Sequence, residues 1–201
     1  MCRSNFYAFD RARSFAHYNE ALAGAIVLLK YEEVACLGTW FAEKLANLVR
    51  DAGDTFRADV VVPVPLHPER RRERGYNQAE LIARPLAKKL GLKLGAFLLV
   101  RTKPRPAQLV LSRSEHWKSV RGAYATRPGV RVDKLRVLLV DDVLTTGATL
   151  DACSRVLKRA GAASVLGLTV ARVVLGSSLK APQKGTRGQR PEKPAGTEKH
   201  L

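Results

Sequence analysis

Several residue types are scarce in this 201-residue chain, and each scarcity excludes a class of protein. Its three cysteines, Cys2, Cys36 and Cys153, are odd in number, widely spaced and form no C-x-x-C pair, which argues against both a disulfide framework and a zinc site. We expect Cys36 and Cys153 to pack as small apolar residues in helices. No apolar run approaches the roughly 18 residues of a membrane span, and the first residues do not resemble a signal peptide. The expected protein is cytoplasmic, without membrane association.

Acidic residues are also few. The chain has 18 Asp and Glu against 35 Lys and Arg, a formal net charge of +17. Residues 176–201 carry six Lys or Arg and two Glu, a net of +4, which leaves +13 for residues 1–175. Such an excess of cations indicates an anionic ligand or partner without identifying it. A polyanionic small molecule, a nucleic acid, or both would satisfy the charge.

The order of patterns along the chain predicts an α/β protein. We expect a helical N-terminal extension over residues 1–55, an α/β domain over 56–175 and a basic disordered tail over 176–201. Alternating strands and helices argue for a parallel sheet with right-handed crossovers. The expected helices cover residues 19–30, 37–49, 77–90 and 149–160, and the expected strands cover 58–65, 96–100, 136–140 and 164–174. Residues up to Ser14 show no clear period.

The most informative segment is residues 137–149. Four apolar residues, Val137 to Val140, predict a strand covered on both faces. Asp141 and Asp142 follow it, and then a Thr/Gly turn opens into a helix whose N-terminus favours phosphate. Two carboxylates would repel a bare anion, so a sugar phosphate fits better: its hydroxyls donate to the carboxylates while its phosphate fills the turn.

A second informative segment is a predicted loop that carries four arginines, whose side chains can bind phosphate. Arg70, Arg71, Arg72 and Arg74 follow the strand that ends near Pro65. A run of arginines alone fits a solvated loop. Because this loop leaves the same sheet edge as Asp141, we instead expect its guanidinium groups to clamp a pyrophosphate.

Residues 141–149 resemble the phosphoribosyl pyrophosphate (PRPP) signature of the type I phosphoribosyltransferases. The resemblance implies that Asp141 and Asp142 are the catalytic pair and hold the ribose hydroxyls. It also implies a loop that binds the 5′-phosphate, made of Thr145, Thr146, Gly147, Ala148 and Thr149.

The segments 63–78, 101–111 and 120–124 narrow the resemblance to the ComF group of phosphoribosyltransferase-like proteins, over about residues 18–174. This implies the type I phosphoribosyltransferase fold: an open, mostly parallel sheet flanked by helices, with a helical N-terminal extension that is the candidate hood for an acceptor. The implied reaction transfers phosphoribosyl from PRPP to an unidentified acceptor and releases pyrophosphate, with Mg²⁺ and no assigned protein ligand to the metal. The pyrophosphate would be held by Arg70, Arg71, Arg74 and Arg101.

The resemblance leaves an alternative open: a non-catalytic accessory protein of DNA uptake that binds single-stranded DNA and a competence helicase. The oligomeric state is open too. The family commonly begins with a four-cysteine zinc ribbon, whereas one cysteine, Cys2, stands where its last cysteine would be. Either the ribbon is absent or the true start lies upstream.

Residues 101–121 predict a long basic loop that closes over pyrophosphate. They contain six Lys or Arg and one Glu. Within them the family pattern Glu-Arg-Arg-x-Asn is replaced at 115–119, where His116 and Trp117 stand at the two arginine positions. This departure puts the contacts of the loop, and turnover, in question.

Overall fold

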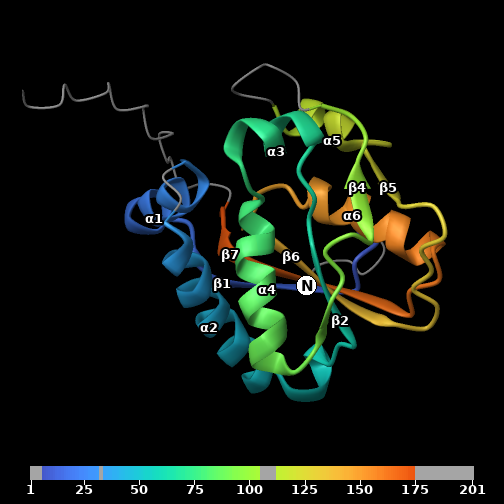
Figure 1. Ribbon diagram of the computed structural model, residues 1–201, viewed down its shortest axis with the longest axis horizontal. Coiled ribbons are helices and arrows are strands. Elements are labelled where there is room, and N and C mark those ends of the chain that lie inside the picture. The colour runs from blue at the N-terminus through green and yellow to red at the C-terminus, as the bar shows by residue number, and fades with distance from the viewer. Residues whose placement is uncertain (1–5, 32–33, 105–111, 175–201) are drawn as a thin grey trace, which may run out of the picture.

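The protein is built on a five-stranded parallel sheet (Figure 1), seen in a computed structural model that describes residues 6–31, 34–104 and 112–174. The order of the strands is β1-β7-β6-β2-β3, and every neighbouring pair is parallel. The bounds are β1 Arg11–His17, β2 Val60–Pro63, β3 Lys93–Leu94, β6 Arg136–Leu144 and β7 Ser164–Arg172. The predicted parallel α/β sheet is therefore confirmed.

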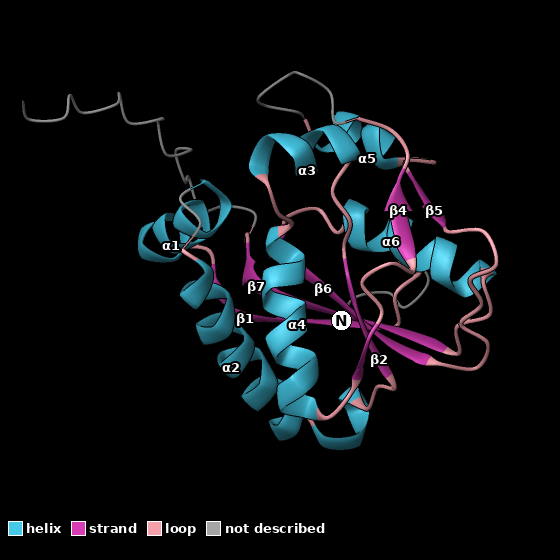
Figure 2. Cartoon of the chain, in the orientation of Figure 1, coloured by secondary structure: helices cyan, strands magenta, loops and turns pink. Residues whose placement is uncertain are grey.

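Helices cover both faces of this sheet, and a small antiparallel ribbon joins one of these layers (Figure 2). The ribbon pairs β4, Leu99–Arg101, with β5, Tyr124–Thr126. The helices are α1 Glu20–Tyr31, α2 Ala35–Asp51, α3 Pro68–Arg74, α4 Gln78–Leu90, α5 Arg113–Val120 and α6 Ala148–Arg159, with a 3-10 turn at Gly53–Phe56. No helix in the described ranges is long and apolar enough to cross a membrane.

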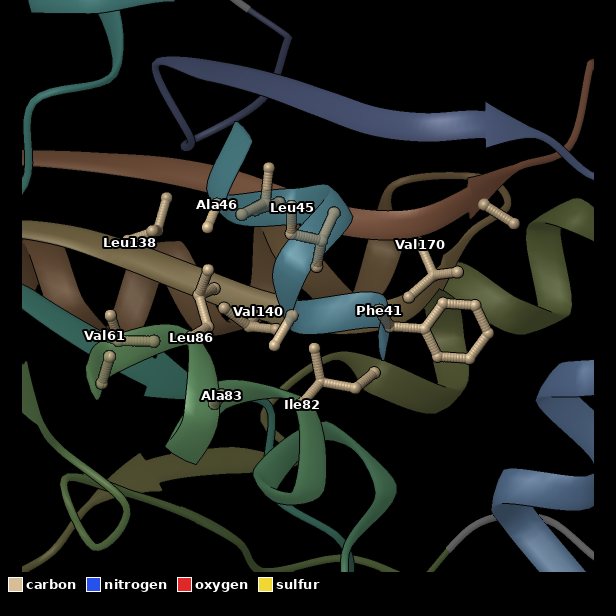
Figure 3. Close-up of a cluster of buried hydrophobic side chains, with 14 of the residues drawn as sticks. Phe41, Leu45, Ala46, Val61, Ile82, Ala83, Leu86, Leu138, Val140 and Val170 are labelled. Atoms are coloured by element: carbon tan, nitrogen blue, oxygen red, sulfur yellow. The ribbon is translucent and has the colours of Figure 1, made fainter. Parts of the chain in front are cut away.

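Alternation along β6 divides the core into two layers. Leu138 and Val140 face α2 and α4, whereas Val137 and Leu139 face α6 and the ribbon. Figure 3 shows the first layer, in which Phe41 of α2 and Ile82 of α4 lie with Val170 of β7. Helix α2 therefore belongs to the same core as the sheet.

Helices α4 and α6 have boundaries close to those predicted from the sequence. The side chain of Asn77 accepts a hydrogen bond from the N–H of Ala79 and caps α4, which ends at Gly91 in the left-handed conformation with φ +65°. The helix after the Thr/Gly turn begins at Ala148, one residue before the predicted Thr149.

Strand β1 was not predicted, and its pattern explains why. Arg11, Arg13 and His17 are exposed while the residues between them are half-buried, so the segment carries no apolar run. It is a strand because it pairs with β7, an interaction reinforced by a 2.6 Å hydrogen bond between the hydroxyls of Ser14 and Thr169. Pairing with a distant segment is invisible to a local pattern.

Three local expectations were wrong. The arginines expected in a loop after β2 lie in helix α3, which begins at Pro68 and ends before Gly75 at φ +83°. The basic segment 101–121 begins with the last residue of β4 and contains α5 rather than being one long loop, and its residues 105–111 lie outside the described ranges. Cys153 is buried in α6 as expected, but Cys36 is exposed on α2.

The shared core predicts that Phe41→Ala destabilises the whole protein. The ring is fully buried, and loss of a buried Phe side chain costs about 3–5 kcal/mol of unfolding free energy. Urea unfolding should show this loss in one transition that reports both helix and sheet. The neighbouring Trp40 is 46% exposed and is the control. Equal losses for Trp40→Ala and Phe41→Ala, or a separate transition for the N-terminal helices, would contradict a shared core.

Candidate functional site

The topology creates a switch point between β2 and β6. From β2 the chain continues through α4 to β3 on one side, and from β6 through α6 to β7 on the other, with the two helices on opposite faces of the sheet. Open α/β sheets bind ligands at such a switch point, outside the carboxyl ends of the strands. Strand β2 ends at Pro63 opposite Val140, while β6 continues to Leu144. Asp141 and Asp142 occupy this overhang.

The two carboxyl groups are buried side by side, and their pKa values are shifted in opposite directions. Their residues are 8% and 6% exposed, and Asp141 Oδ1 accepts a 2.9 Å hydrogen bond from the N–H of Asp142. Burial, and then the adjacent Asp142, raise the pKa of Asp141 well above its ordinary value. Burial also acts to raise the pKa of Asp142, but the Lys30 ammonium outweighs it and lowers that pKa. Asp141 therefore keeps its proton to a higher pH than Asp142 does.

Lys30, in the last turn of α1, is the functional residue that sequence reasoning missed. Its ammonium forms an ion pair with Asp142 Oδ2. Burial acts to lower the pKa of Lys30, but Asp142 and then Asp141 leave it raised. The end of α1 is held in place by Tyr76, whose hydroxyl donates a 2.8 Å hydrogen bond to the carbonyl of Leu29. Only the charge of Lys30 within an otherwise apolar helix end could have signalled this role.

The Thr/Gly turn between β6 and α6 has the conformation that its residues favour. Gly147 adopts φ +79° and precedes the first turn of α6. Thr146 Oγ1 accepts a 3.3 Å hydrogen bond from the N–H of Ala148, and Thr149 forms a side-chain hydrogen bond with Tyr124. Thr145 is exposed. The turn presents the N-terminus of α6 beside the carboxylate pair, as predicted.

An aromatic cover from the N-terminal segment lies on this turn. The ring of Tyr7 packs so closely on Gly147 that an added Cβ would lie 2.8 Å from it. Its hydroxyl donates to the carbonyl of Thr146 at 3.2 Å, and it stacks on Phe9 with ring centroids 4.7 Å apart. Trp117 of α5 stacks on Tyr7 at 6.0 Å. A cavity of about 480 Å³ runs from this cover and the turn along β1.

His116 and Trp117 stand at the positions where the resemblance led us to expect arginines, and both reach the turn. The Nδ1 atom of His116 lies 2.9 Å from Thr146 Oγ1. Trp117 packs on the aromatic cover through the rings of Phe6 and Tyr7. An imidazole ring and an indole ring therefore stand where the resemblance led us to expect two guanidinium groups.

The structure brings two of the predicted pyrophosphate residues together with Lys30. Arg70 and Arg74 of α3 line a cavity of about 290 Å³ with Lys30, Tyr31 and Glu73. The guanidinium of Arg74 lies 5.0 Å from the centre of the Tyr31 ring. The other two predicted arginines do not line this cavity.

Arg71 and Arg101 are engaged elsewhere. Arg71 forms an ion pair with Glu80 of α4 at 3.1 Å. Arg101, at the end of β4, donates to the hydroxyl of Tyr124 at 3.1 Å. Both Arg101 and Asp141 act electrostatically on Tyr124, whose pKa is raised, chiefly by burial. Arg101 therefore contacts Tyr124, which lies within electrostatic reach of Asp141.

The raised pKa of Asp141 predicts how the substitution of this residue changes stability with pH. The folded state raises the pKa of Asp141 above 3.8. This group therefore favours folding below that pH, and the benefit is lost as pH rises through the folded pKa. Asp141→Asn should be more stable than the parent near pH 7 in urea unfolding, with a difference that shrinks toward about pH 3.

Asp59→Asn is the control of opposite sign. Hydrogen bonds from Arg136 lower the pKa of Asp59 to about 2, so Asp59 stabilises the fold above its ordinary pKa and loses this effect as pH falls toward about 2. Asp59→Asn should therefore be less stable near neutral pH. A shift of the same sign in both variants would contradict the assigned charges.

Comparison with known proteins identifies the family. The phosphoribosyl transferase domain model matches residues 77–187, more than half of the chain. Competence protein F of Haemophilus influenzae is 31% identical over 168 residues, covering 80% of this chain and 72% of that protein. DNA utilization protein YhgH of Salmonella typhi is 30% identical over 161 residues, covering 78% and 70%. Adenine phosphoribosyl transferase of Trypanosoma brucei superposes with a TM-score of 0.44 at 14% identity, covering 80% of this chain and 76% of that one.

The family match covers α4 and the sheet edge that carries the carboxylate pair and the turn, and the relatives extend it over most of the chain. The chain belongs to the ComF family of type I phosphoribosyltransferase-like proteins.

Proposed function

We propose that this protein binds Mg²⁺-PRPP at the β2–β6 switch point and transfers its phosphoribosyl group to an acceptor with release of pyrophosphate. The observation that carries the proposal is the buried Asp141–Asp142 pair at the start of the Thr/Gly turn, with Lys30 paired to Asp142 and two arginines lining a cavity with Lys30. A ligand that suits it has hydroxyls next to one phosphate and a second, more highly charged phosphate group. PRPP has this arrangement.

Each part of the ligand has a matching part of the site. Asp142 accepts a hydrogen bond from a ribose hydroxyl, and Asp141 beside it is the second carboxyl group for the ribose. The N–H groups at the start of α6 bind the 5′-phosphate. Arg70, Arg74 and Arg101 bind the pyrophosphate. Arg71 contributes only if it leaves Glu80.

The donor set fits Mg²⁺ that arrives with the substrate. Within the described ranges no group of three or more His, Cys, Asp or Glu side chains could hold a metal by itself. Mg²⁺ commonly uses one or two carboxylates together with substrate phosphates and water, and Asp141 and Asp142 can serve in this way. When bound, the metal would supply charge neutralisation for the pyrophosphate.

The reaction breaks the bond between C1 of ribose and the pyrophosphate oxygen and forms a bond between C1 and the acceptor. The electron pair of the broken bond leaves with pyrophosphate, and positive charge develops on the ribose ring. The protein contributes by positioning the ribose and by stabilising the leaving group with its arginines. The acceptor gives up its proton to solvent in this scheme.

Binding is tested by calorimetry with PRPP and Mg²⁺. The double substitution Asp141→Asn with Asp142→Asn should abolish PRPP binding, because amides cannot supply the carboxylate charge that holds Mg²⁺ and the ribose. The matched control, Asp51→Asn with Asp54→Asn, removes two exposed carboxylates and should bind as the parent does. Unchanged affinity in the Asp141 and Asp142 variant would rule out the proposed site.

Turnover of labelled PRPP across a set of nucleobases separates an enzyme from a sensor. Release of pyrophosphate that requires one acceptor would support transfer. PRPP binding without release, for every acceptor tried, would favour a protein that only senses PRPP.

A second candidate function, the binding of single-stranded DNA as an accessory of DNA uptake with a helicase, has separate support. The relatives include a competence protein and a DNA utilization protein. The chain carries a net +17, and it exposes aromatic rings next to cations: Arg127 lies 5.0 Å from the centre of the Phe97 ring, which is 58% exposed. Exposed aromatic and basic side chains are typical of sequence-tolerant single-strand binding.

This candidate predicts a strong dependence on salt. Single-stranded DNA should shift in a gel at low salt, and the affinity should fall steeply between about 50 and 200 mM salt because counterions are released. Phe97→Ala should weaken binding by about 1–3 kcal/mol if a base stacks there. The absence of any shift at low salt would exclude the candidate.

A further inference from the structure

Lys30 lies between a buried carboxylate and a cavity lined by cations. On one side its ammonium pairs with the buried carboxylate of Asp142. On the other, Lys30 lines the 290 Å³ cavity with Arg70 and Arg74. Its side chain is 25% exposed, against 8% for that of Asp142. The cation is therefore accessible from the cavity while the carboxylate beneath it is nearly closed off.

The cavity itself favours a small anion. Lys30, Arg70 and Arg74 face one carboxylate, Glu73, which is exposed and lies 3.9 Å from Arg70. The guanidinium of Arg74 donates a hydrogen bond to the side chain of Gln78 and packs on the ring of Tyr31. Lys30 is the only one of these three cations for which the described part of the chain shows an ion pair with the catalytic carboxylates.

We propose that Lys30 is a positioning residue that pairs with Asp142 in the free protein and transfers its ammonium to the pyrophosphate group when PRPP binds. The inference rests on the proposed function and adds to it a residue from the N-terminal helical segment. The exchange releases Asp142 for the ribose hydroxyl at the moment when the pyrophosphate arrives. Ribose binding and leaving-group binding are coupled through this one side chain.

The position of Lys30 supports such an exchange. Leu29 is fully buried and its carbonyl accepts the hydrogen bond from Tyr76, so the backbone of α1 is held next to the loop that follows α3. The lysine side chain has a flexible four-carbon stem and a compact charge. The ammonium can therefore move from the Asp142 carboxylate to a pyrophosphate oxygen without any movement of the helix. An arginine at this position would keep the charge but would carry it on a larger, planar group.

Two ligands separate this role from a merely structural one. PRPP carries the pyrophosphate, whereas ribose 5-phosphate lacks it and needs only the carboxylate pair and the turn. In Lys30→Met, affinity for Mg²⁺-PRPP should fall by about tenfold or more, as expected for loss of a hydrogen bond to a charged group. Affinity for ribose 5-phosphate should stay the same or rise, because Lys30 no longer competes for Asp142.

Calorimetry with both ligands is the measurement, with two controls. Lys88→Met removes an exposed lysine from α4 and should change neither affinity. Lys30→Arg keeps the charge and should recover much of the PRPP affinity. Equal loss of both ligands in Lys30→Met, or loss of neither, would overturn the role of Lys30. If the parent protein itself binds no PRPP, the proposed function fails instead.

A second comparison covers the case in which Lys30→Met does not fold. Removing one partner of a buried pair leaves the other charge uncompensated, and Asp142→Asn removes that charge. Inorganic pyrophosphate with Mg²⁺ should therefore bind Asp142→Asn about tenfold or more tightly than it binds Asp142→Asn with Lys30→Met. Equal affinities in these two variants would overturn the proposal.

Discussion

The site depends on the burial of two adjacent carboxyl groups at the end of one strand. Two such groups cannot both be ionised at low cost, because burial and mutual repulsion oppose the second charge. In the structure the pKa of Asp141 is raised, and Asp142 forms an ion pair with Lys30. This ion pair joins the end of α1 to the part of β6 that extends beyond β2, and Lys30 also lines the cavity next to α3.

Strand order explains why these groups meet. Because β2 and β6 are neighbours whose crossovers leave in opposite directions, their carboxyl ends form the switch point of the sheet. Helix α3 follows the first strand and the Thr/Gly turn follows the second. Charges that are some 70 residues apart in the chain, such as Arg74 and Asp142, are thereby placed at one edge.

The N-terminal part of the chain contributes more than an appendage would. Strand β1 extends the sheet, Phe41 fills its core, Lys30 pairs with Asp142, and Tyr7 covers Gly147. A helical extension over residues 1–55 was expected, and its proposed boundary as a domain stays a prediction. The contacts show that this segment shares the core and the site with the residues that follow it.

The sequence alone determined the features that depend on local chemistry: the apolar strand before Asp141, the Thr/Gly turn with Gly147 at positive φ, and the cap at Asn77. Backbone conformation and burial pattern at these positions depend on residues that are neighbours in the chain. Tertiary structure decided the rest: that residues 11–17 are a strand, that His116 bonds Thr146, and that Lys30 neutralises Asp142. These depend on partners far away in the chain, whose positions exist only once the sheet and its crossovers have formed.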